Sequence, residues 1–183
     1  MNKNTIILGI DPGTNIMGYG LIKATEKDPV LIGFGCVKMQ KSFDYYEKLK
    51  CIFERTLELV DEYKPDALAI ESQFYGNNVQ SMLKLGRAQG AAISAALYRS
   101  VPVFEYAPRK IKQSITGYGN ASKEQIAALL QKLMKFDTLP DKLDATDGLA
   151  VALCHYYQQG KTIPSGKYKG WGDFIRKNPE RIG

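Results

Sequence analysis

Apolar residues recur along the chain with two different periods. Short apolar or alternating runs predict strands, and apolar residues three or four positions apart predict amphipathic helices. The first pattern predicts strands over residues 5–10, 17–23, 31–38, 67–70 and 101–106. The second predicts helices over residues 45–63, 79–99, 108–114, 122–135 and 144–158. We therefore expect an α/β protein whose mixed sheet begins as an antiparallel meander, continues through parallel crossovers and carries helices on both faces.

Two local signals set the ends of predicted helices. The helix over residues 45–63 is expected to end before Pro65, because the residue that precedes a proline avoids helical backbone angles. Ser122 and Gln125 match a capping box, in which each side chain bonds the backbone amide of the other residue. This pair predicts that the next helix starts near residue 122.

The helix predicted over residues 79–99 carries an apolar row and many small residues. The row consists of Met82, Leu85, Ile93 and Leu97. Gly86 and Gly90 lie in the same segment, and a glycine inside a helix costs about 1 kcal/mol relative to alanine. The two glycines therefore predict very close packing against a sheet or another helix, either within one subunit or between two subunits.

Length and charge predict one compact domain followed by a basic tail. The chain has 183 residues, of which 44% are apolar, and a net charge of +6. Residues 160–183 hold six basic and two acidic residues, so we expect a domain over residues 1–158 and a tail over residues 159–183. The tail either binds a polyanionic partner or is solvated, and its candidate contacts are Lys167, Tyr168, Lys169 and Trp171. No apolar run approaches the roughly 20 residues of a membrane span, and we expect a cytoplasmic protein.

Sulfur and imidazole ligands are too few for several kinds of catalytic site. The cysteines, Cys36, Cys51 and Cys154, are far apart and odd in number, which is typical of small apolar residues in a reducing compartment. His155 is the sole histidine, so neither a zinc site nor a Ser-His-Asp triad is expected. Metal-dependent hydrolysis would have to use oxygen ligands, which select Mg²⁺ or Mn²⁺.

Four acidic residues lie where a protein core does not normally place charge. Asp11 and Glu71 each follow a short apolar strand, and ligand sites of α/β sheets lie at strand ends. Asp144 and Asp147 are three residues apart at the start of a helix that continues as an almost wholly apolar segment. Each residue alone is compatible with a helix cap or a surface salt bridge.

Together the four carboxylates predict a metal site. Clustered carboxylates repel one another and are costly to bury unless a cation lies between them. Four carboxylates suit two divalent ions about 3.5–4 Å apart, which activate water for attack on a phosphodiester and stabilise the leaving 3′ oxygen. The net positive charge of the chain suits a polyanionic substrate.

Five blocks of sequence closely resemble the RuvC family of Holliday-junction resolvases. They are ILGIDPGTNIMGYGLI (residues 7–22), LAIESQF (68–74), LKLGRAQG (83–90), VFEYAPRKIKQSITGYGNASKEQ (103–125) and DATDGLAVALCH (144–155). The match runs in order over roughly residues 5–158. As a set the blocks are highly specific, although any one alone would be weak.

This resemblance implies a ribonuclease-H-like fold and a homodimer. It implies paired Mg²⁺-dependent nicks in two strands of like polarity at a four-way DNA junction, leaving 5′-phosphate and 3′-hydroxyl ends, in homologous recombination and DNA repair. Two Mg²⁺ ions per subunit are expected, with Mn²⁺ as a substitute. Members of the family cooperate with the RuvA–RuvB branch-migration complex.

The resemblance also implies roles for individual residues. The family's four metal-binding acid positions correspond to Asp11, Glu71, Asp144 and Asp147. Lys112 and Lys123 stand where the family carries basic residues that contact DNA. Phe74 matches an aromatic residue that stacks on junction bases, and Tyr75 lies beside it. Arg87, on the helix over residues 79–99, is a further DNA-contact candidate, although it is also compatible with an ordinary solvated side chain.

Three other functions compete with this interpretation. The segment GIDPGTNIMGYG resembles the first phosphate loop of actin-like ATPases, but the chain is too short for their two domains and has no second phosphate loop. A non-catalytic junction-binding module gains nothing from carboxylates beside a phosphate. A ribonuclease-H-like nuclease that acts on RNA is the third alternative, and its substrate preference would distinguish it.

Overall fold

The computed structural model describes residues 4–25, 28–73, 78–140 and 142–159. Its elements, in chain order, are β1 (Ile6–Asp11), β2 (Ile16–Lys23), β3 (Val30–Lys38), α1 (Tyr45–Tyr63), β4 (Ala67–Glu71), α2 (Val79–Tyr98), β5 (Val103–Tyr106), α3 (Pro108–Thr116), α4 (Lys123–Met134) and α5 (Asp144–Gln158). Every predicted strand and helix is present with ends within about two residues, as is usual for boundary assignments. None of the described helices is both long and apolar enough to cross a bilayer.

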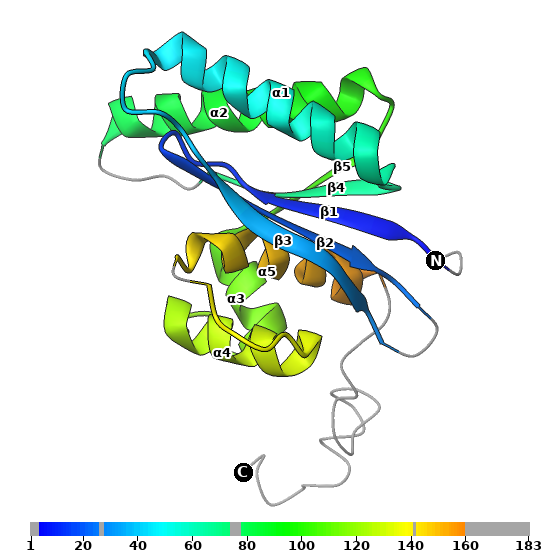
Figure 1. Cartoon of the computed structure of the whole chain (residues 1–183). Coiled ribbons are helices and arrows are strands. Elements are labelled where there is room, and N and C mark those ends of the chain that lie inside the picture. Colours follow the sequence, from blue (N-terminus) through cyan, green and yellow to red (C-terminus); the bar gives the residue numbers. More distant parts are fainter. Residues whose placement is uncertain (1–3, 26–27, 74–77, 141, 160–183) are drawn as a thin grey trace, which may run out of the picture.

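The five strands form one mixed sheet in the order β3-β2-β1-β4-β5. The pairs β1–β2 and β2–β3 are antiparallel, whereas β1–β4 and β4–β5 are parallel. Helices α1 and α2 cover one face of the sheet, and α3, α4 and α5 cover the other (Figure 1). The predicted mixed sheet with helices on both faces is therefore confirmed.

Each face of the sheet has its own apolar core, because alternate strand residues point to opposite faces. On β1, Ile7 packs with Leu149 and Leu153 of α5 on one side. Leu8, next along the strand, packs on the other side with residues of α1 and α2. This two-sided burial explains why the central strands read as continuous apolar runs.

Helix α5 lies unusually close to β1 and β2. The contact is lined by four glycines: Gly9 on β1, Gly18 and Gly20 on β2, and Gly148 on α5. A Cβ atom at any of them would lie under 3.0 Å from backbone atoms of the facing element. At Gly18 the nearest atom is the backbone oxygen of Asp144, and Gly18 pairs with Asp11 across the β1–β2 ladder. The first turn of α5 is thus held beside the end of β1.

The predicted helix ends are confirmed. Lys64 closes α1 in the left-handed conformation immediately before Pro65, and its amide bonds the carbonyl of Val60. Ser122 and Gln125 form the expected capping box at the start of α4.

The packing expected around the glycines of α2 is not present among the described residues. The helix buries a different stripe, which consists of Ala88, Gln89, Ala92, Ala95 and Ala96. A Cβ atom at Gly86 or Gly90 would meet nothing within 4 Å, and Leu97 is 57% exposed. The interpretation that these glycines pack closely within one subunit is therefore wrong. Of the predicted apolar row, Ile93 packs against the core, whereas Leu97 lies exposed.

We expect Gly18→Ala to lower the free energy of unfolding by about 2 kcal/mol, because the added methyl group would force α5 away from β2. Gly33→Ala is the matched control on β3, where a Cβ atom would meet nothing within 4 Å. Urea unfolding of both variants measures the difference. Equal stability of the two variants would contradict the close approach of α5.

Candidate active site

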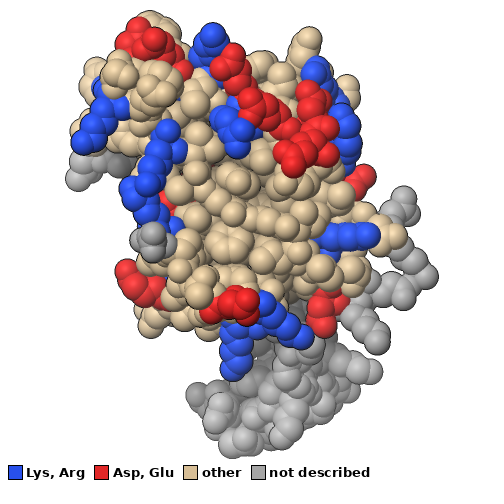
Figure 2. All heavy atoms as spheres, viewed as in Figure 1, with Lys and Arg blue, Asp and Glu red and all other residues tan. Residues whose placement is uncertain are grey.

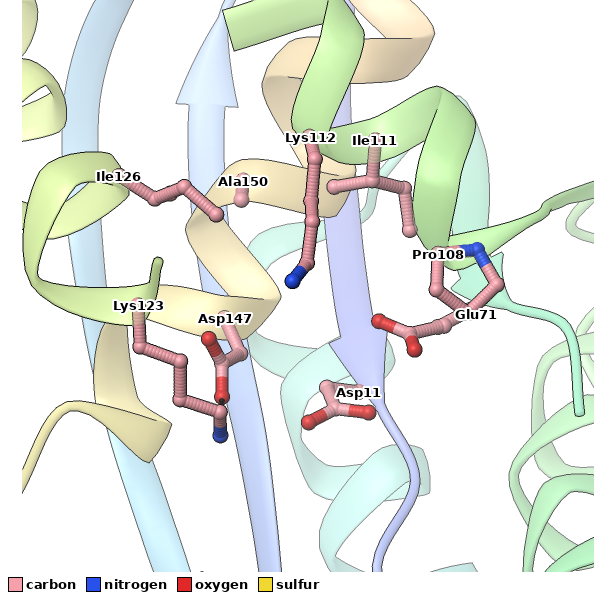
Figure 3. Close-up of a pocket in the computed structure, with 9 residues that line it drawn as sticks. All are labelled: Asp11, Glu71, Pro108, Ile111, Lys112, Lys123, Ile126, Asp147 and Ala150. Carbon is pink, nitrogen blue, oxygen red and sulfur yellow. Dashed lines mark hydrogen bonds and ion pairs between the residues drawn. The ribbon is translucent and has the colours of Figure 1, made fainter. Parts of the chain in front are cut away.

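A cavity of about 100 Å³ opens at the end of the sheet where β1 and β4 finish, between α3, α4 and α5 (Figure 3). Its lining residues are Asp11, Glu71, Pro108, Ile111, Lys112, Lys123, Ile126, Asp147 and Ala150. Charged groups and apolar side chains therefore share one small space.

Three of the four predicted carboxylates line this cavity. Asp11 and Glu71 end neighbouring parallel strands whose register pairs Ile10 with Ile70, so the two acids emerge side by side. Asp147 reaches the same space from the first turn of α5, which the glycine contact holds against the sheet. Figure 3 shows Asp11 and Glu71 close to each other, whereas the carboxylate of Asp147 is turned toward Lys123.

Asp144 lies at the margin of the cavity. Its side chain is 38% exposed, compared with 14% for Asp147, and it is not among the lining residues. It belongs to the same charge cluster nevertheless, because Lys123 Nζ lies 3.6 Å from Asp144 Oδ1. The structure thus places the fourth acid beside the other three without bringing it into the cavity.

Burial removes water from around the carboxylates of the cavity, which makes their charged forms less stable. Burial, together with the negative charge of Asp147, raises the pKa of Asp11 to about 6. Burial also raises the pKa of Glu71 to about 8, with Asp11 as the next cause. The pKa of Asp147 is raised by burial too, although Lys123 opposes this effect. The site therefore favours either protons or a cation among its carboxylates.

Sequence reasoning missed the apolar wall that causes this desolvation. Pro108 and Ile111 come from the start of α3, and Ile126 comes from α4. The only available signal was the spacing of apolar residues on these two short helices, which does not reveal what they face.

Two lysines predicted as DNA contacts also line the cavity. Lys123 Nζ donates a hydrogen bond to Asp147 Oδ2 at 2.6 Å. Lys112 Nζ donates to the backbone oxygen of Ala121 at 3.0 Å, which holds its ammonium group at the cavity wall. Both ammonium groups therefore lie at the wall of the cavity that holds the acids.

The donor set fits a hard divalent cation, because carboxylate oxygens are the ligands that Mg²⁺ and Mn²⁺ prefer. The raised pKa values indicate uncompensated negative charge that such a cation would offset. Within the described ranges, however, no three acidic, histidine or cysteine side chains are grouped closely enough to form a ready coordination shell. Asp147 is paired with Lys123 instead.

Other predicted contacts lie elsewhere. Arg87 lies away from the cavity, with its guanidinium carbon 5.9 Å from the centroid of the Tyr45 ring. Phe74 and Tyr75 lie outside the described residues, as does the tail from residue 160 onward. Their assignments stay predictions.

The sole histidine has a structural position. His155 is fully buried, its Nδ1 lies 2.7 Å from the hydroxyl of Tyr106, and burial lowers its pKa to about 4. Cys154 is buried beside it in the chain, whereas Cys36 and Cys51 are partly exposed. The expectation of small buried cysteines therefore fits Cys154 best.

Three features together define a ribonuclease-H-like nuclease. They are the mixed sheet order, the acids at the ends of β1 and β4, and the acidic first turn of the helix packed across them. Residues 7–155 match the family model described as crossover junction endodeoxyribonuclease RuvC. A relative of that name from Christiangramia forsetii is 56% identical over 182 residues, which cover 100% of this chain and 95% of the relative. Another from Cytophaga hutchinsonii is 55% identical over 188 residues, which cover 100% of this chain and 93% of the relative.

A solved structure agrees with the sequence relatives. T. thermophilus RuvC in complex with Holliday junction substrate matches with a TM-score of 0.78 and 31% identity, covering 85% of this chain and 94% of that chain. The chain belongs to the RuvC family of crossover junction endodeoxyribonucleases, a family of metal-dependent nucleases. Membership decides against the actin-like ATPase, the non-catalytic module and the RNA-directed nuclease.

Proposed function

We propose that this chain resolves Holliday junctions during homologous recombination and DNA repair. It makes paired nicks in two strands of like polarity and leaves 5′-phosphate and 3′-hydroxyl ends. The observation that carries the proposal is the convergence of Asp11, Glu71 and Asp147 in one desolvated cavity of a RuvC-family chain. The junction complex of the T. thermophilus relative supports four-way DNA as the substrate.

The catalytic acids in this proposal are Asp11, Glu71, Asp144 and Asp147, which would hold two Mg²⁺ ions, with Mn²⁺ as a substitute. Divalent ions at such a site supply activation of water and neutralisation of charge on the phosphate. The apolar wall formed by Pro108, Ile111 and Ile126 excludes water and strengthens these electrostatic interactions. Asp144, at the margin, would join the ligand set from the same helical turn as Asp147.

Lys112 and Lys123 offset the negative charges of the carboxylates and of a bound phosphate. Lys123 compensates Asp147 and Asp144 in the protein alone, and in the complex its ammonium group is available to a phosphate. Lys112 provides a second ammonium group from α3. Phe74 and Tyr75 are proposed to stack on bases near the crossover, where one stacked base contributes about 1–3 kcal/mol.

A homodimer is part of the same proposal, because two symmetrical nicks require two active sites related by a twofold axis. The exposed face of α2 supports this assembly. It presents an apolar stripe with glycines at Gly86 and Gly90, and its large members are Val79 (63% exposed), Leu83 (51%) and Leu97 (57%). Residues at this spacing share one helical face, and the glycines allow a partner helix to approach closely.

The remaining partners follow from the family. The enzyme is proposed to act in the cytoplasm with the RuvA–RuvB branch-migration complex. A nuclease domain over residues 1–158 carries the active site, and the basic tail over residues 159–183 adds positive charge for DNA.

We expect Asp11→Asn to reduce junction cleavage by at least about 100-fold, since it removes a charged oxygen ligand. Junction binding should stay unchanged or become tighter, because one negative charge beside the phosphate is lost. Gel-based cleavage and fluorescence anisotropy measure the two effects with the same labelled junction. A variant that cleaves at the wild-type rate would rule out the proposed metal site.

We expect Leu83→Glu to weaken the homodimer by at least about tenfold, because it places a charge in the apolar stripe of α2. Leu129→Glu is the matched control, since Leu129 is a 39% exposed leucine on α4, on the opposite face of the sheet. Sedimentation equilibrium gives the dimer dissociation constant of each. Similar dissociation constants for both variants and the wild type would exclude α2 as the interface.

A further inference from the structure

An exposed aromatic pair begins helix α1. Tyr46 is 73% exposed, and its ring contacts that of Tyr45 edge to face with centroids 5.9 Å apart. Asp44 and Glu47 form a capping box that fixes this turn. A tyrosine ring left this open contributes little to the core, although such rings are effective at binding surfaces.

Basic groups surround the pair. The Arg87 guanidinium carbon lies 5.9 Å from the Tyr45 ring centroid, and the Tyr45 hydroxyl donates to the backbone oxygen of Lys84 at 2.9 Å. These contacts join the start of α1 to α2. In the parts of the chain that the structure describes, Arg87 forms no ion pair with a carboxylate, so its charge stays available to another molecule.

The same turn of α1 is linked to the active site. Lys48, three residues after Tyr45, donates from Nζ to Asn15 Oδ1 at 3.1 Å. Asn15 belongs to the loop between β1 and β2 that begins directly after Asp11. Because an amide oxygen carries no net charge, this hydrogen bond does not neutralise Lys48. Helices α1 and α2 both begin at the sheet end that carries the cavity (Figure 1).

Lysine and arginine side chains are visible at this end of the molecule in the space-filling view (Figure 2). The acids of the capping box, Asp44 and Glu47, lie in the same turn, and each carboxylate accepts a hydrogen bond from the backbone amide of the other residue. Their charge is offset in part by the positive end of the helix dipole. The exposed Tyr46 ring and the ammonium and guanidinium groups therefore offer contacts for an anion that carries planar groups.

We propose that Tyr45, Tyr46, Lys48 and Arg87 form a second DNA-contact surface, which binds the strand beyond the scissile phosphate. Phosphates lie against Lys48 and Arg87, and an unpaired base stacks on Tyr46. Guanidinium and ammonium groups are the usual partners of phosphate oxygens, and exposed aromatic rings accept bases of any sequence. This inference rests on the proposed junction-resolving function and extends its substrate contact beyond the carboxylate cavity.

The other end of the same two helices offers an internal control. Tyr98 is 68% exposed, and the Arg99 guanidinium carbon lies 4.8 Å from its ring centroid. Arg99 is compensated, however, by two hydrogen bonds to Asp61 at 2.7 and 2.8 Å. This tyrosine and arginine resemble Tyr45 and Arg87 in kind but lack both a free charge and a link to the active site.

The test uses the full-length protein and a synthetic four-way junction with 2-aminopurine beside the crossover. Binding is measured in Ca²⁺, which prevents turnover, over a range of salt concentrations. Lys48→Gln and Arg87→Gln should each reduce the slope of log affinity against log salt by about 0.9. Tyr46→Ala should weaken binding about fivefold or more and reduce the 2-aminopurine quenching, with the slope unchanged. Tyr46→Phe should restore both.

Tyr98→Ala and Lys50→Gln are the matched controls, since Lys50 lies on α1 beside Glu54 at 3.7 Å. Both should bind like the wild type. If the Tyr46, Lys48 and Arg87 variants also match the wild type while it binds and nicks junctions, this surface is refuted and the proposed function stands. If these variants lose the dimer in sedimentation, the surface contacts a second copy, which also overturns the inference. If the wild type neither binds nor nicks junctions, the proposed function itself fails.

Discussion

The contact between helix α5 and strands β1 and β2 is the constraint on which the active site depends. Glycines on both sides remove the side chains that would otherwise separate the backbones by several ångströms. Gly18 lies against the backbone oxygen of Asp144 and pairs with Asp11, so the acidic first turn of α5 is fixed beside the end of β1. Substitution by any larger residue here would change the distance between carboxylates that are remote in sequence. The close packing of α5 on the sheet therefore also sets the positions of the candidate catalytic carboxylates.

The close approach of α5 to β1 has an electrostatic consequence for the acids. The carboxylates that the contact gathers are desolvated by Pro108, Ile111 and Ile126, and the pKa values of Asp11 and Glu71 rise to about 6 and about 8. The protein compensates part of this charge with Lys123, whose ammonium group bonds Asp147. A divalent cation and a DNA phosphate together would replace that compensation. Lys112 on α3 places a second ammonium group at the wall of the same cavity.

The sequence predicted the elements that depend on local chemistry and on long apolar patterns. The sheet strands, the helix start at Ser122 and the end of α1 before Pro65 all have such signals, and all are confirmed. The close packing within one subunit that Gly86 and Gly90 predicted was wrong, because residue spacing does not distinguish a helix face that packs within the chain from one that stays exposed. The acids of the candidate site were predicted from strand ends and from a resemblance, and three of them line one cavity. The marginal position of Asp144 and the exposure of Tyr46 depend on side-chain placement, which the periodicity of the sequence does not encode.

Metal-dependent junction cleavage is tested by a nicking assay on a synthetic four-way junction and on linear duplex of the same sequence, with Mg²⁺ or with EDTA. We predict symmetrical nicks in two strands of like polarity, on the junction alone and with Mg²⁺ present, because the carboxylates of the cavity act only through a bound divalent ion. Equal cleavage of the linear duplex, or nicking that persists in EDTA, would exclude metal-dependent junction resolution by this chain.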